Sequence, residues 1–167
     1  MPNTFELIAS STVGSGGTAT ISFTSISGTY TDLCLYFSLR SSDGSDYIGL
    51  KFNTSSSTFT GRFLTGTGSA AGSTSRTDNL YTGTTVPSSS TASTFSSGSL
   101  YIPNYAGSTN KSFSIDSVLE NNATAAESRL MAGLWSTTSA ITQIDLAHPT
   151  ANFVQYSTAY LYGVKNA

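Results

Sequence analysis

Apolar and polar residues alternate one by one along much of this chain, which is the pattern of a strand with one buried face. The clearest example is the run 32–40, in which Leu33, Leu35, Phe37 and Leu39 share one face. Pairs such as Ser-Gly and Asp-Gly, which favour tight turns, interrupt the alternation at short intervals. The pattern predicts a succession of short strands joined by turns.

The same alternation recurs from one end of the chain to the other, and no window shows a sustained helical period. Short strands at this spacing are typical of antiparallel sandwiches. We therefore predict an all-β, jelly-roll-like antiparallel β-sandwich of about eight to ten strands, formed as a single domain by residues 1–167. The strand-like runs are 4–13, 18–26, 32–40, 47–53, 95–103, 112–120, 129–135, 140–146 and 153–165.

Residues 54–93 differ from the rest, because they are poor in apolar residues and dense in Ser, Thr and Gly. Short strands are expected near 62–64 and 80–81. The remainder of this region is expected to form long surface loops, which often carry function in a compact domain.

The last run has apolar residues on both of its faces. One face carries Tyr156, Tyr160, Tyr162 and Val164, and the other carries Ala159 and Leu161. A strand of this kind is usually central to a sandwich, and we favour that interpretation. The alternative is that one face meets another subunit, and the two interpretations are compatible in an oligomer.

The chain is unusually poor in charge. Charged residues make up 10% of it and its net charge is -2, whereas an average soluble domain has about 25% charged residues. This composition provides no basic surface for nucleic acid, so no nucleic-acid partner is expected. Polarity comes from Ser and Thr, which form about a third of the chain. Such a surface favours a protein that works inside an assembly, the alternative being a monomer hydrated by its hydroxyl groups.

Targeting signals and cross-links are absent from the sequence. Cys34 is the only cysteine, which excludes an intrachain disulfide, and it is expected as a half-buried strand residue. The start of the chain has neither the basic nor the apolar part of a signal peptide. No stretch has the length of a membrane span, and no membrane partner is expected.

Catalytic chemistry finds little support in the sequence. His148 is the only histidine, Asp145 lies nearby, and no G-x-S-x-G elbow supplies a nucleophile. Because Pro149 follows it, His148 is expected in a surface turn. Asp43 and Asp46 offer too few ligands for a calcium loop. We therefore expect no enzyme activity, no metal and no cofactor.

Aromatic residues are the remaining candidates for contact with a ligand or partner. Tyr101 and Tyr105 flank a predicted turn and are expected to be exposed, where they could contact a glycan or a protein. Trp135 ends an apolar run and is expected in the core. Tyr156 and Tyr160, on one face of the last run, are further candidates for an interface.

Four longer stretches of the chain resemble a domain that recurs in virion proteins of tailed bacteriophages, especially phages of marine bacteria and cyanobacteria. The resemblance extends from Phe5 to Asn166 and is weakest in the region 54–93. The stretches are ATISFTSISGTYTDLCL, LYIPNYAGSTNKSFSIDSVLENNAT, AGLWSTTSAITQIDL and NFVQYSTAYLYGVKN.

This resemblance implies a β-sandwich displayed on the virion, with no catalytic motif to transfer. It leaves two placements open: a decoration (cement) protein on the head, or a module of a tail fibre or appendage. We expect no anchor, collagen-like shaft or coiled coil beside the domain, which favours decoration. The expected partners are the major capsid protein of the same phage and further copies of this chain, after assembly in the host cytoplasm. Host-surface glycans are the alternative partner.

Overall fold

The computed structural model describes residues 4–79, 82–122 and 126–165. These residues form twelve strands and no helix, and accordingly none of them belongs to a helix that could cross a membrane. The strands are β1 (Phe5–Thr12), β2 (Thr20–Phe23), β3 (Asp32–Ser38), β4 (Tyr47–Phe52), β5 (Phe59–Gly66), β6 (Ala71–Arg76), β7 (Gly83–Thr84), β8 (Ser97–Pro103), β9 (Lys111–Leu119), β10 (Glu127–Trp135), β11 (Ile144–Ala147) and β12 (Thr158–Val164).

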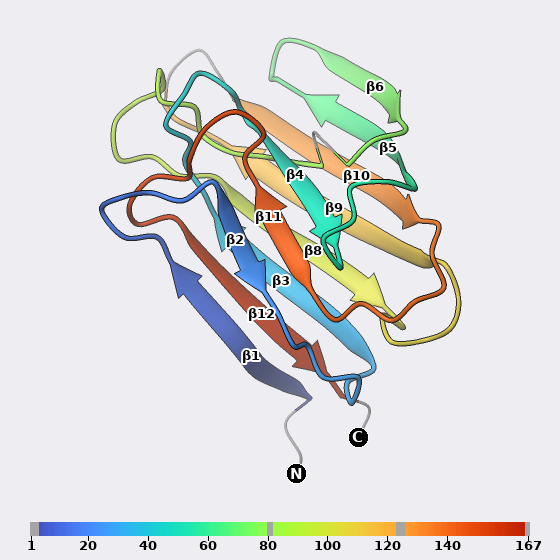
Figure 1. The fold of residues 1–167 in the computed structure, drawn as a ribbon. Coiled ribbons are helices and arrows are strands. Elements are labelled where there is room, and N and C mark those ends of the chain that lie inside the picture. The colour runs from blue at the N-terminus through green and yellow to red at the C-terminus, as the bar shows by residue number, and fades with distance from the viewer. Residues whose placement is uncertain (1–3, 80–81, 123–125, 166–167) are drawn as a thin grey trace.

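The strands form two sheets of unequal size. The large sheet has eight strands in the order β1-β12-β3-β8-β9-β10-β5-β6, and the small sheet has four in the order β2-β11-β4-β7. The small sheet lies against one face of the large sheet, as Figure 1 shows, and the hairpin β5–β6 stands at one end of the large sheet. Every ladder between these strands is antiparallel, so the predicted antiparallel sandwich is confirmed.

The pairing pattern is that of a jelly roll. Strands β1, β2, β3 and β4 pair with β12, β11, β8 and β7, respectively, as in a long hairpin. This hairpin is rolled up so that β12 also pairs with β3, and β11 also pairs with β4. Successive strands β1 to β4 therefore alternate between the sheets, which is how a jelly roll builds two layers.

Two further hairpins widen the large sheet beyond the jelly roll. One is β5–β6, inserted between β4 and β7, and the other is β9–β10, inserted between β8 and β11. The region 54–93, expected to form long surface loops with short strands, therefore holds a regular hairpin between its loops. The strand expected near 62–64 is confirmed within β5, whereas the one expected near 80–81 lies outside the described residues.

The alternation in the sequence agrees with burial in the structure. Along β9, buried and exposed residues alternate without a break from Lys111 to Leu119. In β3, Leu33, Leu35 and Phe37 face the small sheet and are buried. Cys34, which points the other way, is also buried rather than half-buried. Burial, with Asp32 nearby, raises the pKa of its thiol.

Aromatic side chains fill one end of the core between the sheets. Phe52, Phe59, Phe113 and Trp135 are all buried, which confirms the expectation for Trp135. The Phe113 ring lies 5.5 Å from that of Phe52 and 6.1 Å from that of Phe59, with edge-to-face geometry in both pairs, which is favourable for aromatic rings. Phe113 also covers Gly133 on the neighbouring strand, so close that a Cβ there would clash with the ring.

Candidate functional site

The exposed apolar side chains of this protein are concentrated on one surface. Nine large apolar side chains are exposed in the described part of the chain, and eight of them project from the face of the large sheet that the small sheet leaves uncovered. We call this surface the outer face. The eight are Phe5, Leu7, Tyr36, Leu64, Tyr101, Val118, Leu130 and Tyr160. An exposed apolar surface of this extent marks an interaction site in soluble proteins.

One half of the outer face carries an aromatic patch, which consists of Phe5, Leu7, Tyr36, Tyr101, Tyr160 and Tyr162 on β1, β12, β3 and β8. Within it, the half-buried ring of Tyr162 lies 5.9 Å from that of Tyr36 and 6.3 Å from that of Phe5. Both pairs are edge to face, so the rings hold one another in place.

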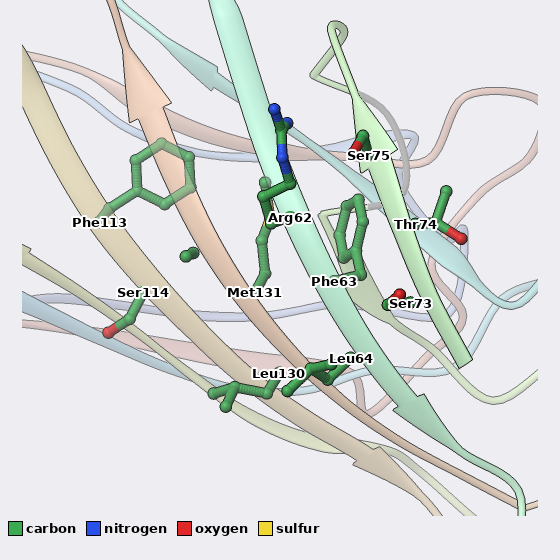
Figure 2. A pocket seen from close by; sticks show the side chains of 11 residues that line it. Arg62, Phe63, Leu64, Ser73, Thr74, Ser75, Phe113, Ser114, Leu130 and Met131 are labelled. Atoms are coloured by element: carbon green, nitrogen blue, oxygen red, sulfur yellow. The ribbon is translucent and has the colours of Figure 1, made fainter. Parts of the chain in front are cut away.

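The other half carries an aliphatic patch, which consists of Leu64, Val118 and Leu130 on β5, β9 and β10. Leu64 and Leu130 are direct cross-strand partners, and Figure 2 shows their side chains side by side. Next to them is a groove of about 510 Å³, whose lining includes Arg62, Ala132 and Ser114 of the outer face together with residues at inward positions such as Met131. The small side chains of Ala132 and Ser114 leave the sheet hollow at this point, while the neighbouring leucines stand higher.

A polar strip separates the two patches. The sheet register places Ser99 on β8 beside Asp116 on β9, between Tyr36 on one side and Leu130 on the other. One continuous row across the sheet therefore runs from aromatic through hydroxyl and carboxylate to aliphatic. In full, this row is Ser10, Tyr160, Tyr36, Ser99, Asp116, Leu130, Leu64 and Ser73.

Few charges interrupt the outer face. In the strands of the large sheet only Asp32, Asp116 and Arg62 place charged side chains on this side. Asp32 already accepts hydrogen bonds from the Tyr101 hydroxyl at 2.7 Å and from the backbone N–H of Asn104 at 2.9 Å. The first of these bonds, together with burial, raises the pKa of Tyr101 to about 12. The Tyr101 hydroxyl is therefore held as a donor to Asp32.

The four tyrosines that the sequence suggested as contact residues have different positions. Tyr101 and Tyr160 are exposed members of the aromatic patch. Tyr156 is also exposed, but it lies in the turn before β12, where its positive φ of 73° ends the alternation that would have put it beside Tyr160.

The expectation that Tyr105 is exposed is wrong. Its side chain is fully buried, its hydroxyl donates to the Ser27 carbonyl, and the backbone N–H of Tyr30 donates to its hydroxyl oxygen at 3.4 Å. The cause is Asn104, whose positive φ of 48° redirects the chain after β8. Tyr105 would otherwise have continued the outward face of Tyr101.

Reasoning from the sequence missed the aliphatic half of this surface. Leu64 and Leu130 lie in runs that were predicted as strands, at the alternate positions that a half-exposed strand normally fills with polar residues. An apolar residue at such a position is the signal that could have identified them. Tyr36 carried the same signal in 32–40.

His148 and Asp43, which were considered for catalysis and for a calcium loop, lie next to each other in the structure. The described residues hold no group of three or more His, Cys, Asp or Glu that could bind a metal ion. His148 is buried rather than in a surface turn, and its Nδ1 accepts the Ala151 N–H at 3.0 Å. Asp43 lies 3.6 Å from the other ring nitrogen and accepts hydrogen bonds from Ser45 and Thr150. These contacts fasten the surrounding loops to one another.

Comparison with protein families, with curated proteins and with solved structures finds no match to this chain.

Proposed function

We propose that this protein is a structural component of a bacteriophage virion, and that it is a decoration (cement) protein which binds the major capsid protein and stabilises the head lattice. The observation that carries the proposal is the outer face, where eight of the nine exposed large apolar side chains share one surface with three charged ones. Such a surface suits permanent contact between subunits. The sequence resemblance to virion surface domains supports this role.

A decoration protein stabilises the head by mass action. It binds assembled capsid subunits and not dissociated ones, so each bound copy favours the assembled state. Because contacts made by apolar and hydroxyl side chains are little screened by salt, such binding should survive washing in moderately high salt. Neither an enzyme activity nor a cofactor is part of this proposal.

The test is to locate the protein on purified particles of the phage that encodes it. Gold-labelled antibody against this chain should mark the head, and quantitative gel analysis should find hundreds of copies in each particle. Heads that lack the protein should rupture at lower temperature than complete heads. Label confined to the tail, with bare heads equally robust, would refute a decoration role.

A tail-fibre or appendage module that binds host glycans is the second candidate. It is favoured by the aromatic patch, because exposed tyrosines such as Tyr101 and Tyr160 can stack against the apolar faces of sugar rings. This role predicts a few tens of copies or fewer, located on the tail. It also predicts that Tyr160→Ala abolishes binding to host-surface glycans while Ser22→Ala, a change on the far side of the small sheet, does not.

A further inference from the structure

We propose that the outer face binds the outer face of a second copy of this chain, about a two-fold axis that runs parallel to the strands between β8 and β9. In this dimer the aromatic patch of each copy covers the aliphatic patch of the other. The inference rests on the assembly role proposed above, and it assigns the outer face to contact between copies of this chain, so that the capsid protein is bound by other surfaces of the dimer.

The outer face has the area that a stable dimer needs. Eight strands spaced about 4.8 Å apart, with about seven residues each at about 3.3 Å, make a surface of roughly 34 Å by 23 Å. This corresponds to about 800 Å² from each partner, which is the size of a standard protein–protein interface. One copy of the same face is thus large enough to cover it.

The shape of a twisted sheet permits this pairing. Strands rotate steadily across a sheet, so the outer face of the eight-stranded sheet is a saddle. A two-fold rotation about an axis along the central strands carries such a saddle onto itself. Two copies can therefore nest at an even separation of about 10 Å, as the layers of sandwiches do.

The register of the large sheet then brings the two patches together. Counted outward from the axis, β3 of one copy lies opposite β10 of the other, and β12 lies opposite β5. In the row that crosses the polar strip, Tyr36 therefore meets Leu130 of the second copy. Tyr160 likewise meets Leu64 of the second copy. The two-fold axis makes each of these contacts twice.

The same operation gives each charged group on the two central rows a suitable neighbour. Asp116 on β9 lies opposite the hydroxyl of Ser99 on β8 of the second copy. In the next row, Arg62 lies opposite the ring of Tyr162 of the second copy, where a cation–π contact is favourable.

The sizes of the facing side chains also match in the row of Arg62. Tyr101 lies opposite Ser114 of the second copy, so the large ring meets the hollow that Ser114 and Ala132 leave in the sheet. A side chain that stands above the sheet therefore faces a depression in the partner.

A two-fold axis across the strands is the other way to pair these faces, and the positions of the two patches oppose it. Each strand would then lie over its own copy, which leaves aromatic patch on aromatic patch and, where the axis follows the row of Asp116, sets the two carboxylates directly opposite each other. Like charges facing one another across an interface are costly. The parallel axis instead places each aromatic patch on an aliphatic patch and each Asp116 opposite Ser99.

The first experiment measures mass in solution. At about 100 µM the purified chain should have twice its monomer mass of 17.4 kDa by light scattering after size-exclusion chromatography, since interfaces of this size have micromolar or tighter affinity. Tyr36→Lys and Leu130→Glu should each weaken the dimer at least about tenfold. Both side chains are half exposed in the monomer, so circular dichroism and melting temperature should show that both variants fold.

The second experiment tests the register. When the Tyr36→Lys and Leu130→Glu variants are mixed, each heterodimer contains one native Tyr–Leu contact and one introduced Lys–Glu pair. At a concentration at which each variant alone is largely dissociated, dimer mass should therefore return in the mixture. The pair Tyr160→Lys and Leu64→Glu should behave in the same way, which keeps the test valid if one of the first two variants fails to fold.

Three outcomes would overturn the inference. They are a wild-type chain that stays monomeric at about 100 µM, a dimer that both outer-face variants leave intact, and mixtures in which no dimer returns. The matched control is Ser22→Lys, an exposed position on the small sheet, which should leave the dimer intact; a dimer lost through this change would also contradict the pairing. Antibody labelling of particles tests the virion role separately, because a monomer found on heads refutes only the dimer and a dimer absent from particles refutes only the virion role.

Discussion

Gly133 in β10 should not tolerate a methyl group, because the Phe113 ring of the neighbouring strand occupies the space. A Cβ at this position would lie 2.2 Å from two carbons of that ring, against 3.4 Å or more for ordinary contact. The ring would have to retreat by more than 1 Å. It cannot do so freely, because Phe52 and Phe59 pack against it at 5.5 Å and 6.1 Å between centroids.

The expected loss of stability follows from two opposing effects. Overpacking of a well-packed core costs about 1–3 kcal/mol. Replacing Gly by Ala also restricts the unfolded chain, which returns about 0.4–1 kcal/mol. We therefore expect Gly133→Ala to lower the free energy of unfolding by up to about 2.5 kcal/mol. Each kcal/mol should lower the melting temperature by about 2–4 °C in a chain of this size.

The assay is urea unfolding of Gly133→Ala beside a matched glycine in the same sheet. Gly66 in β5 is that control, because a Cβ there meets nothing within 4 Å. Gly66→Ala should leave stability unchanged or raise it slightly, because only the effect on the unfolded chain remains. Adding Phe113→Leu to Gly133→Ala should cost less than the sum of the two single changes, since the smaller side chain removes the clash.

A Gly133→Ala variant as stable as Gly66→Ala would refute this reasoning. It would mean that Phe113 does not cover Gly133, and hence that β9 and β10 are not paired in the register described. That register also sets which residues share the rows of the outer face, so the result would remove the basis of the proposed dimer contacts.

Three further predictions follow from buried side chains. Leu35→Ala should lower the free energy of unfolding by about 2–5 kcal/mol in urea titrations, because a fully buried leucine leaves a cavity; an unchanged midpoint would contradict its place in the core. Burial lowers the pKa of His148 below 6.5. As the pH falls, the unfolded chain therefore protonates this imidazole before the folded chain does. Stability should be level above about pH 6.5 and decrease below it, and His148→Asn should abolish this slope. Burial raises the pKa of Cys34, so iodoacetamide should label it slowly in the native protein and rapidly in urea; equal rates would contradict its burial.

The sequence predicted most reliably those strands that bury a single apolar face. In β3 the buried residues Leu33, Leu35 and Phe37 were identified one by one, and β9 alternates strictly within the predicted run 112–120. β6 was missed because Ala71–Arg76 contains no large apolar residue and stands almost wholly exposed at the edge of the sheet. Its place is determined by backbone hydrogen bonds to β5, for which the side chains provide no pattern.

The candidate surface was half predictable for a related reason. Tyr101 and Tyr160 lie within strands, where alternation decides which way a side chain points. Tyr105 and Tyr156 lie at or just after residues with positive φ, namely Asn104 and Tyr156 itself, where alternation no longer applies. Which face of a strand remains uncovered is, moreover, a property of the two sheets together, because the outer face is the one that lies opposite to the small sheet (Figure 1).

The unequal sheets also bear on how the outer face can be used. A jelly roll alone would leave two sheets of equal width, but the two inserted hairpins enlarge only the large sheet. Strands β9, β10 and β5 of these hairpins carry the aliphatic patch and the hollow beside it, whereas the jelly-roll strands carry the aromatic patch. The insertions thus give one surface both halves of a self-complementary pair.

A two-fold contact uses each such surface once and stops at two copies, whereas a contact between different surfaces would continue into a filament. The edge strands offer that second route, and β1 is interrupted by a bulge between Leu7 and Ala9 while β6 is short and polar, both features that discourage growth at an edge.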